Sequence, residues 1–335
     1  DRDIIIEINP RTSRSSALAS KATGFPIALV SAMLASGMTL DEIPCGKYGT
    51  LDQYYPDGDY VVVKFARWAF EKFKGVSDHL GTQMRAVGEV MAIGKTYKEA
   101  FQKAIRSLEK NVYGLGFVKD YHEKTLDELL ALLHFATPDR QFQMYEALRK
   151  GATVEQLHGL TKIKAYFIEQ MKELVDAEER ILAWAAEHPA QMLPADELAS
   201  AKRDGFADRY LAQLLHLPEA QVREARLDAG TRQAWEGVHV SSTQDSEYFY
   251  STYNAPDKSE PAPGKKIMIL GGGPNRIGQG IEFDYCCVHA AFALKKLGFS
   301  TIIVNCNPET VSTDYDTSDK LYFEPLTAED VLSIY

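Results

Sequence analysis

Cysteine is scarce in this sequence of 335 residues. The four cysteines are Cys45, Cys286, Cys287 and Cys306, and no two of them form a C-x-x-C arrangement. Neither a disulfide framework nor a structural zinc site is indicated, because both need recurring cysteines at close spacing. The cysteines are therefore expected to be small buried thiols in a reducing cytoplasm.

Positive charge and long hydrophobic runs are also in short supply. Lysine and arginine number 37 against 47 aspartates and glutamates, which gives a formal net charge of −10. This balance repels a phosphate backbone and an anionic lipid surface, so binding to nucleic acid or to a membrane is disfavoured. No run of about 18 apolar residues is present, so no transmembrane helix is predicted.

The composition that remains is that of an ordinary globular protein. Hydrophobic residues make up 45% and charged residues 25%, which excludes a disordered or low-complexity chain. At roughly 150 residues per domain, the length predicts about two domains. The chain opens without Met and stops at Tyr335 inside a helical pattern, so we expect a piece of a longer polypeptide.

Residues 1–116 have mixed α/β character. An apolar strand at Ile4, Ile5 and Ile6 begins this region, and a stretch rich in Gly, Tyr and Asp occupies 45–59. Apolar spacing and strand-forming runs predict further elements. These are a helix at 25–36, a strand at 60–65 and a helix at 97–109.

Residues 117–230 predict an all-α domain of short helices. Leucines at helical spacing form apolar faces, and prolines and glycines interrupt the pattern repeatedly. Short helices invite a helix-turn-helix interpretation, but residues 120–230 carry 13 basic against 20 acidic side chains. A groove-binding module should have a basic face, so packing or self-association is favoured.

Residues 231–264 are predicted to be a linker, and 265–335 the start of a βαβ unit. The linker contains the aromatic residues Tyr248, Phe249, Tyr250 and Tyr253, which are expected to pin it to a neighbouring surface. Beyond it, apolar strands at 267–270 and 301–304 flank a glycine-rich turn and a helix.

One candidate site follows the isoleucine strand. In an extended strand, Glu7, Asn9 and Arg11 point to the same side, which presents a carboxylate, an amide oxygen and a guanidinium together. The two oxygens suit Mg²⁺ or Mn²⁺, and the guanidinium suits phosphate, as phosphoryl transfer requires. The alternative is a solvated strand end with incidental charges.

A second candidate is the glycine-rich turn at 271–280, where a strand runs into a helix. Backbone N–H groups at such a turn can hold an anion. The spacing differs from a dinucleotide fingerprint, which disfavours a simple NAD site. The glycines could equally serve close packing, although Asn275, Arg276, Gln279, Glu282 and Asp284 crowd the turn with more polarity than packing requires.

A third candidate is Glu89, which apolar side chains bracket in the stretch from Gln83 to Met91. A carboxylate in that setting is either exposed at a strand edge or buried with a partner. The eight histidines are scattered, and Cys45 has no base nearby in the sequence. No nucleophile–base pair is therefore predicted.

Four stretches have almost the same sequence as motifs of the large chain of carbamoyl phosphate synthetase, which the chain therefore resembles: 7–26, 87–91, 269–288 and 304–323. The resemblance is weak through the helical middle. It implies a multidomain fold in which 1–116 is the C-terminal part of the carboxyphosphate-forming ATP-grasp domain and 117–230 is a helical oligomerisation domain. After the linker, 265–335 would open the Rossmann-like pre-ATP-grasp domain of the carbamoyl-phosphate-forming half.

The resemblance also implies an ATP-dependent ligase that makes carbamoyl phosphate from bicarbonate, ammonia from glutamine and two ATP, through carboxyphosphate and carbamate. Glu7 and Asn9 would coordinate the Mg²⁺ or Mn²⁺ bound to ATP, with Arg11 and Arg14 facing phosphate and the intermediate. An interior passage would carry carbamate between the two sites and exclude water from it. The residues implied to line it are Arg14, Met84, Glu89, Arg276, Gly280 and Glu309.

The implied partners are a glutamine amidotransferase small chain or domain and, through residues 117–230, further copies of the chain. The parent would serve pyrimidine or arginine synthesis in the cytoplasm. Because the remaining ATP ligands would precede Asp1, the chain alone is expected not to turn over ATP. Two alternatives remain: a helical oligomerisation module without activity of its own, and a Rossmann oxidoreductase, which the turn spacing disfavours.

Overall fold

The structure is a computed structural model, and it describes all residues except 1–4, 6–7, 242, 244–246, 262 and 281. The strand predicted at Ile4 to Ile6 falls mostly outside the described residues. The neighbouring side chains of Ile5 and Ile8 are largely exposed.

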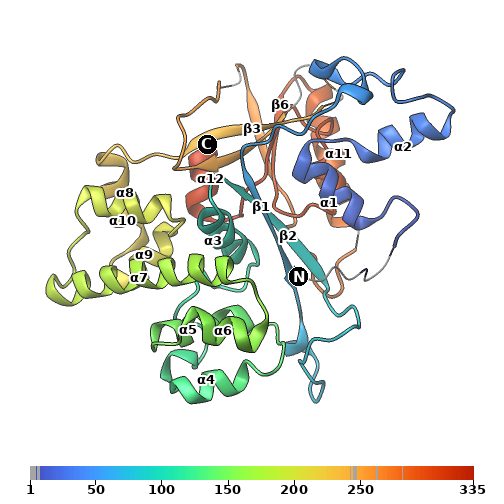
Figure 1. The fold of residues 1–335 in the computed structure, drawn as a ribbon. Coiled ribbons are helices and arrows are strands. Elements are labelled where there is room, and N and C mark those ends of the chain that lie inside the picture. The colour runs from blue at the N-terminus through green and yellow to red at the C-terminus, as the bar shows by residue number, and fades with distance from the viewer. Residues whose placement is uncertain (1–4, 6–7, 242, 244–246, 262, 281) are drawn as a thin grey trace.

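The first region is an antiparallel strand pair flanked by helices (Figure 1). Strands β1 (Val61–Arg67) and β2 (Gly88–Gly94) pair along their whole length, and α3 (Tyr97–Ser107) packs on them. Helix α1 (Arg14–Thr23) begins at a Ser13 capping box and ends at Gly24 in the left-handed conformation, before α2 (Ile27–Ala35). The predicted strand at 60–65 and helices at 25–36 and 97–109 are confirmed to within a few residues.

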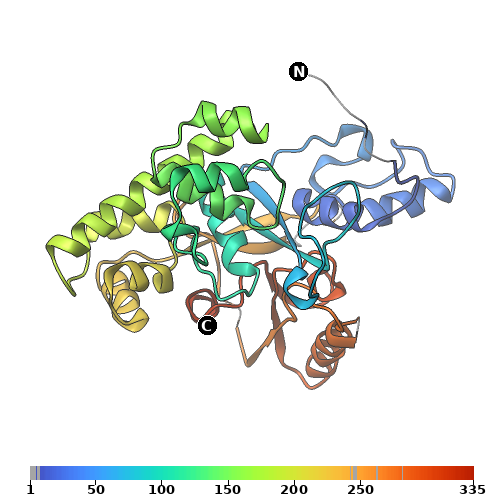
Figure 2. The ribbon, with the colours of Figure 1, turned by 90° about the horizontal axis from the view of Figure 1, so that it is seen from below.

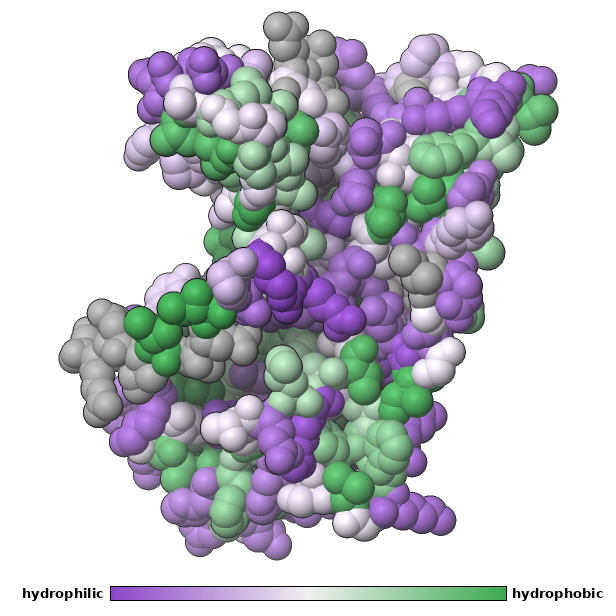
Figure 3. All heavy atoms as spheres, turned by 90° about the vertical axis from the view of Figure 1, so that its right-hand side faces the viewer, coloured by the Kyte–Doolittle hydropathy of each residue, from purple (hydrophilic) through white to green (hydrophobic). Residues whose placement is uncertain are grey.

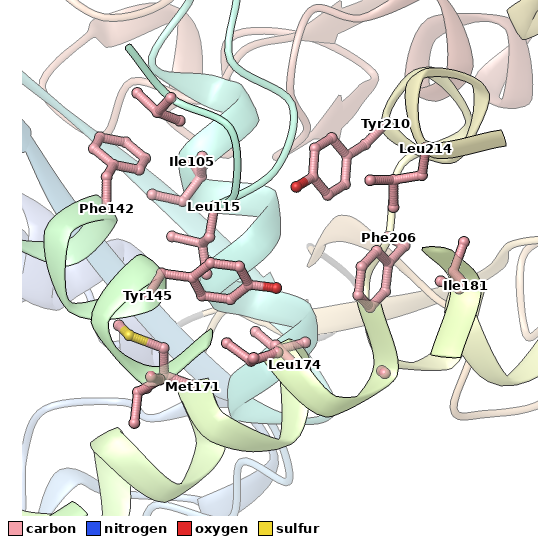
Figure 4. Packing of buried hydrophobic residues seen from close by; sticks show 14 of the residues in the cluster. Ile105, Leu115, Phe142, Tyr145, Met171, Leu174, Ile181, Phe206, Tyr210 and Leu214 are labelled. Carbon is pink, nitrogen blue, oxygen red and sulfur yellow. The ribbon is translucent and has the colours of Figure 1, made fainter. Parts of the chain in front are cut away.

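The middle region consists of helices only, as predicted. Thr125 and Thr153 form capping boxes, which explains why helices restart after the turns. The helices are α4 (Leu126–Leu132), α5 (Arg140–Arg149), α6 (Val154–Thr161), α7 (Ala165–Glu187), α8 (Ala195–Arg203), α9 (Asp208–Leu215) and α10 (Glu219–Asp228). Their core continues into α3 through Phe101 and Ile105, of which Figure 4 labels Ile105, so the helices and the first region share one hydrophobic cluster.

A five-stranded sheet in the order β3-β4-β7-β6-β5 forms the last region. Strands β5 (Lys266–Leu270) and β6 (Ser300–Val304) are parallel and joined through α11 (Glu282–Lys296), which confirms the predicted βαβ unit. Strand β7 (Lys320–Tyr322) follows, and then α12 (Ala328–Ile334). Short 3₁₀ helices occur at Gly46–Tyr48, Leu51–Gln53, Phe70–Lys72, Tyr121–Glu123 and Val311–Thr313.

The prediction that 231–264 is only a linker is wrong. It contains β3 (Ala234–His239) and β4 (Glu247–Thr252), an antiparallel pair that extends the sheet, with β4 parallel to β7. Polar residues conceal the alternating pattern, but Tyr248 and Tyr250 are fully buried. The aromatic residues do anchor the segment, since Tyr253 Oη donates to Glu329 3.2 Å away.

The expectation of four buried thiols is half right. Cys45 and Cys306 are buried, whereas Cys286 is exposed and Cys287 lies between these classes. Both of the latter belong to α11, a helix that buries only a narrow face against the sheet. Burial raises the pKa of the Cys306 thiol to about 12, so this thiol is unreactive.

Buried ion pairs join the three regions around α3, and we call this set the buried junction. Its cations and carboxylates are Lys103, Arg106, Lys202, Arg226, Asp208, Glu324, Glu329 and Asp330. In Figures 1 and 2, α12 lies beside α3, between the helices of the middle region and the sheet. The region boundaries are thus held by charge as well as by apolar packing.

Among the described residues, no single helix is long and apolar enough to cross a membrane, although α1 and α2 would pass that test jointly, across a 113° bend. Figure 3 views the side of the molecule that carries α1 and α2 and shows hydrophobic patches separated by polar surface.

Candidate functional site

The glycine-rich turn after β5 is braced by two asparagines that follow β6. Asn305 Oδ1 accepts a hydrogen bond from Gly273 N (3.2 Å). Asn307 Nδ2 donates to Gly273 O (3.0 Å) and to Asn275 Oδ1 (3.2 Å). Both asparagines are completely buried, so their hydrogen bonds fix the turn rather than compete with water.

Strand β2 lies directly against this turn. A Cβ atom added to Gly88 would lie 2.7 Å from Asn275 O and 2.8 Å from Asn275 N, closer than side chains tolerate. Met91 N also donates to Cys306 O at 2.9 Å. The first region therefore meets the turn of the last region through backbone, and only glycine fits at position 88.

Four charged side chains gather beside this contact. Glu89 is buried and pairs with Lys64, which decides between the two alternatives left open by the sequence. Arg14 Nε lies 3.5 Å from Glu309 Oε1, across the two regions. Burial, and then the nearby charge of Glu89, raise the pKa of Glu309, while Arg14 opposes that shift.

One oxygen of Glu89, Oε1, is buried and has no hydrogen-bond partner among the described residues. A buried carboxylate oxygen without a donor is costly in a folded protein. The site therefore offers an acceptor, Glu89, and a largely exposed cation, Arg14, to a molecule that enters between the regions.

Lys21 is a part of the site whose role the sequence did not reveal. Its ammonium is buried and donates to Pro308 O (2.9 Å), Thr310 O (2.7 Å) and Thr313 Oγ1 (2.7 Å). It also lies 3.1 Å from Asp314. Burial lowers the pKa of Lys21 and raises that of Asp314, so each charge depends on the other. In the sequence, Lys21 is recognisable only as a lysine in a segment rich in hydrogen-bond donors.

The remaining passage candidates are more scattered. Arg276 leaves the turn toward the end of α3, where it pairs with Glu109. Gly280 N donates to Glu282 Oε1 at 3.2 Å. Met84 is almost fully exposed. The structure thus gathers Arg14, Glu89 and Glu309 in one cluster. Among the described residues, no hydrogen bond or ion pair joins Met84, Arg276 or Gly280 to this cluster.

Comparisons with known proteins cover the whole chain. Family models match residues 1–43 (carbamoyl-phosphate synthase L chain, ATP binding domain), 89–230 (carbamoyl-phosphate synthetase large chain, oligomerisation domain) and 263–335 (carbamoyl phosphate synthase preATP-grasp domain). Carbamoyl phosphate synthase large chain of Archaeoglobus fulgidus is 51% identical over all of this chain. Those of Ralstonia nicotianae and Neisseria meningitidis serogroup B are 50% identical over 99% of it.

The chain belongs to the carbamoyl phosphate synthase large chain family. It spans 31% of the length of each of these three relatives. The resemblance recognised in the sequence is therefore confirmed, and it extends through the helical middle, where the motifs were weak.

The metal site expected in this family cannot be assembled from the described residues. Glu7 lies outside them, while Asn9 and Arg11 are exposed. Arg11 Nη1 donates to Thr12 O at 3.2 Å, so it faces its own loop. No cluster of three or more His, Cys, Asp or Glu side chains that could hold a metal occurs within the described part of the chain.

Proposed function

We propose that this chain is the part of an ATP-dependent ligase in which the end of the first ATP-grasp half meets the start of the second. The ligase would make carbamoyl phosphate from bicarbonate, ammonia released from glutamine, and two ATP. The observation that carries the proposal is the contact of Gly88 with Asn275, beside the Arg14–Glu309 pair. The Arg14–Glu309 pair joins segments that match the family at both ends of the chain.

The chemistry of the site suits transit of carbamate between two reaction centres. Carbamate carries a carboxylate, which Arg14 can attract, and N–H groups, which the unpaired Glu89 Oε1 can accept. The pairing of Glu309 with Arg14 offsets the repulsion between this carboxylate and the anion. A path between packed regions also keeps water from a labile intermediate.

At the N-terminal end, Glu7 and Asn9 would hold the Mg²⁺ or Mn²⁺ of ATP, with Arg11 and Arg14 facing the phosphate. The metal would neutralise charge on the transferred phosphoryl group when bound. Met84, Arg276 and Gly280 remain proposed for the passage wall, in which Arg276 would act through its pair with Glu109.

The proposed divisions are 1–116 for the ATP-grasp part, 117–230 for oligomerisation and 265–335 for the pre-ATP-grasp part, with 231–264 now assigned to the sheet. A glutamine amidotransferase small chain would supply ammonia, in the cytoplasm. The 335-residue chain alone would not hydrolyse ATP in response to bicarbonate, and release of ADP under those conditions would contradict this.

The test uses the full-length parent enzyme with Gly88→Ala, because the new methyl group would push Asn275 away. We expect bicarbonate-dependent ATP hydrolysis to persist while carbamoyl phosphate formation falls about tenfold, the equivalent of about 1.4 kcal/mol in a barrier. Gly81→Ala is the matched control, since a Cβ there meets nothing within 4 Å. Equal loss of both activities, or no loss of either, would contradict the passage.

A second candidate function is self-association through the helices. Leu132, Phe135, Tyr166 and Phe167 are large hydrophobic residues exposed on the helical region, whose family model is named for oligomerisation. Sedimentation equilibrium of the whole chain should show a dimer or larger species. Phe135→Ser combined with Tyr166→Ser should then shift it toward monomer, and a chain that stays monomeric at all concentrations would contradict this function.

A further inference from the structure

Helix α1 is docked onto the last region through a lysine. All residues of this helix are described, and Lys21 alone among them is buried. Its ammonium has three N–H groups and uses all of them, so no donor is left for water or for a ligand. The acceptors lie in the loop 308–314 after β6, and they are Pro308 O (2.9 Å), Thr310 O (2.7 Å) and Thr313 Oγ1 (2.7 Å).

The loop 308–314 is folded around this ammonium. Besides the three acceptors, Asp314 Oδ1 lies 3.1 Å from Lys21 Nζ, so four oxygen atoms of one loop surround a single nitrogen. Carbonyl oxygens that point inward at one centre need a donor there, because an unsatisfied carbonyl lowers the stability of the fold. Glu309 lies between the two residues whose carbonyls accept, so the ammonium holds the backbone on both sides of Glu309.

The same loop braces the glycine-rich turn. Thr310 Oγ1 donates to Asn307 O (2.9 Å), and Glu309 N donates to Asn307 Oδ1 (2.9 Å). Asn307 is also the residue whose side-chain amide holds Gly273 and Asn275 of the turn. A shift of the loop would therefore reach both the Glu309 carboxylate and the turn that lies against β2.

The two ends of α1 are held differently. At the C-terminal end, buried Tyr248 of β4 donates from its Oη to Lys21 O, in addition to the contacts of the lysine side chain. At the N-terminal end, the Arg14 side chain is 84% exposed. Its Nε is 3.5 Å from Glu309 Oε1, which is longer than a charge-assisted hydrogen bond. The helix is thus anchored at Lys21 and loosely held at Arg14.

Arg14 and Lys21 lie on the same face of α1. Seven residues are close to two helical turns, so both side chains face the loop 308–314, about 10 Å apart along the helix axis. With this length, a tilt of α1 by about 10° around Lys21 would move Arg14 by about 2 Å. A shift of that size is enough to make or break the contact of Arg14 with Glu309.

We propose that Lys21 is a positioning residue, which fixes α1 to the loop 308–314 and thereby sets the gap between Arg14 and Glu309 through which carbamate passes. The proposal rests on the proposed function, since it concerns the same passage. Without the ammonium, the converging oxygens of the loop separate and α1 loses its buried anchor, so Arg14 and Glu309 no longer have one fixed spacing. Carbamate then escapes to water more often before it reaches the second reaction centre.

The first test measures this spacing in the 335-residue chain. Nitroxide labels at Ser15→Cys and Val311→Cys, both exposed positions, report the distance between α1 and the loop by electron paramagnetic resonance. Exposed Cys286 and its neighbour Cys287 are replaced by serine in every sample. We expect one narrow distance distribution in the original chain, and Lys21→Met should at least double its width, because the helix is then free to tilt.

Two further variants control this measurement. Lys47→Met removes an exposed ammonium that pairs with Asp57 in the same region, and it should leave the width unchanged. Asp314→Asn removes one charge beside the ammonium but keeps α1 and Lys21 intact, so it should broaden the distribution less than Lys21→Met does. An unchanged width in Lys21→Met, or in Asp314→Asn where circular dichroism shows that Lys21→Met does not fold, would overturn the anchoring role.

The second test uses the full-length parent enzyme and measures the ratio of carbamoyl phosphate formed to ATP hydrolysed. We expect Lys21→Met to lower this ratio about tenfold and Lys47→Met to leave it within about twofold. A merely structural role would lower both quantities together and leave the ratio unchanged, and that result would overturn the proposal.

The outcomes separate this proposal from the proposed function. If Gly88→Ala lowers carbamoyl phosphate formation but Lys21→Met leaves the ratio unchanged, the passage stands and the role of Lys21 is overturned. If neither variant affects the transfer, the passage itself is contradicted and the role of Lys21 falls with it.

Discussion

The two places where the regions of this molecule meet are built in opposite ways. At the buried junction, four cations and four carboxylates are enclosed, and nearly every charge has a partner within hydrogen-bond distance. At the contact of the glycine-rich turn with β2, Arg14 is largely exposed, while Glu89, like Glu324 of the buried junction, keeps one buried oxygen without a hydrogen-bond partner among the described residues. Enclosed charge pairs fix one arrangement of the regions, whereas an exposed cation is available to a ligand.

The contrast has a physical origin in the sequence positions involved. Lys103 and Arg106 lie one turn apart on α3 and reach Glu324 and Asp330, more than 200 residues later. Such pairs are too costly to bury singly, so each must find its partner for the chain to fold. The glycine-rich contact instead uses backbone and asparagine amides, which carry no net charge, so the regions meet there without burying an ion pair between the turn and β2.

The largest expected effect comes from breaking the buried junction. The Asp208 carboxylate accepts hydrogen bonds from Lys202 Nζ (2.8 Å) and from two nitrogens of the Arg226 guanidinium. All three side chains are fully buried. Asp208→Ala leaves the buried Arg226 without its carboxylate and Lys202 with Glu329 alone, and we expect the free energy of unfolding to fall by about 3–5 kcal/mol. Urea denaturation of the whole chain measures this free energy for the variant and the original protein.

The control for this prediction is Asp176→Ala, which removes an exposed pair with Lys172 one turn away on α7. Its cost should stay below about 1 kcal/mol. If Asp208→Ala were no more destabilising than Asp176→Ala, the buried junction would not be what holds the regions together.

The second effect is a dependence of stability on pH. Burial raises the pKa of Glu324 to about 7, although Lys103 opposes the shift. Between the ordinary glutamate value and about 7, the folded state therefore binds more protons than the unfolded state does. The contribution of this group to the free energy of unfolding is largest at acid pH, falls as pH rises through that window, and is constant above it.

Glu324→Gln should remove this slope, and denaturation curves at several pH values between 4.5 and 8 would show it. Glu309→Gln at the glycine-rich contact is the comparison: its pKa is raised too, but the group is less buried and the slope should change less. A larger change for Glu309→Gln would reverse the contrast between the two contacts.

The sequence predicts some elements of this fold and misses others. Periodicity located α2, α3, β1 and the βαβ unit, since these depend on neighbours in sequence. It missed β3 and β4, because polar residues conceal the alternation of both strands and because β7, the second partner of β4, lies some 70 residues further on. Local pattern carries no record of such pairing.

The candidate site shows the same limit. Glu89 could be singled out because apolar side chains bracket it in the sequence, and Glu309 because its segment resembles the family. The burial of Lys21 depends on carbonyls from 308 and 310, nearly 290 residues away, and no local feature of a lysine in a helix indicates it. Motif resemblance supplied residue identities, but geometry supplied their partners.

The smallest expected effect concerns the link between the two contacts. Glu109 lies two residues beyond the end of α3 and has positive φ, and its carboxylate pairs with Arg276, which is nearly half exposed. Glu109→Gln should change the free energy of unfolding by less than about 1 kcal/mol, because a partly exposed pair contributes little. It should nevertheless release Arg276, so that trypsin cleaves after this residue about threefold faster, while Asp120→Asn, which removes the exposed pair with Lys124, leaves the rate unchanged. If cleavage after Arg276 stayed at the original rate in Glu109→Gln, the braced asparagines alone would hold the turn, and α3 would not connect it to the buried junction.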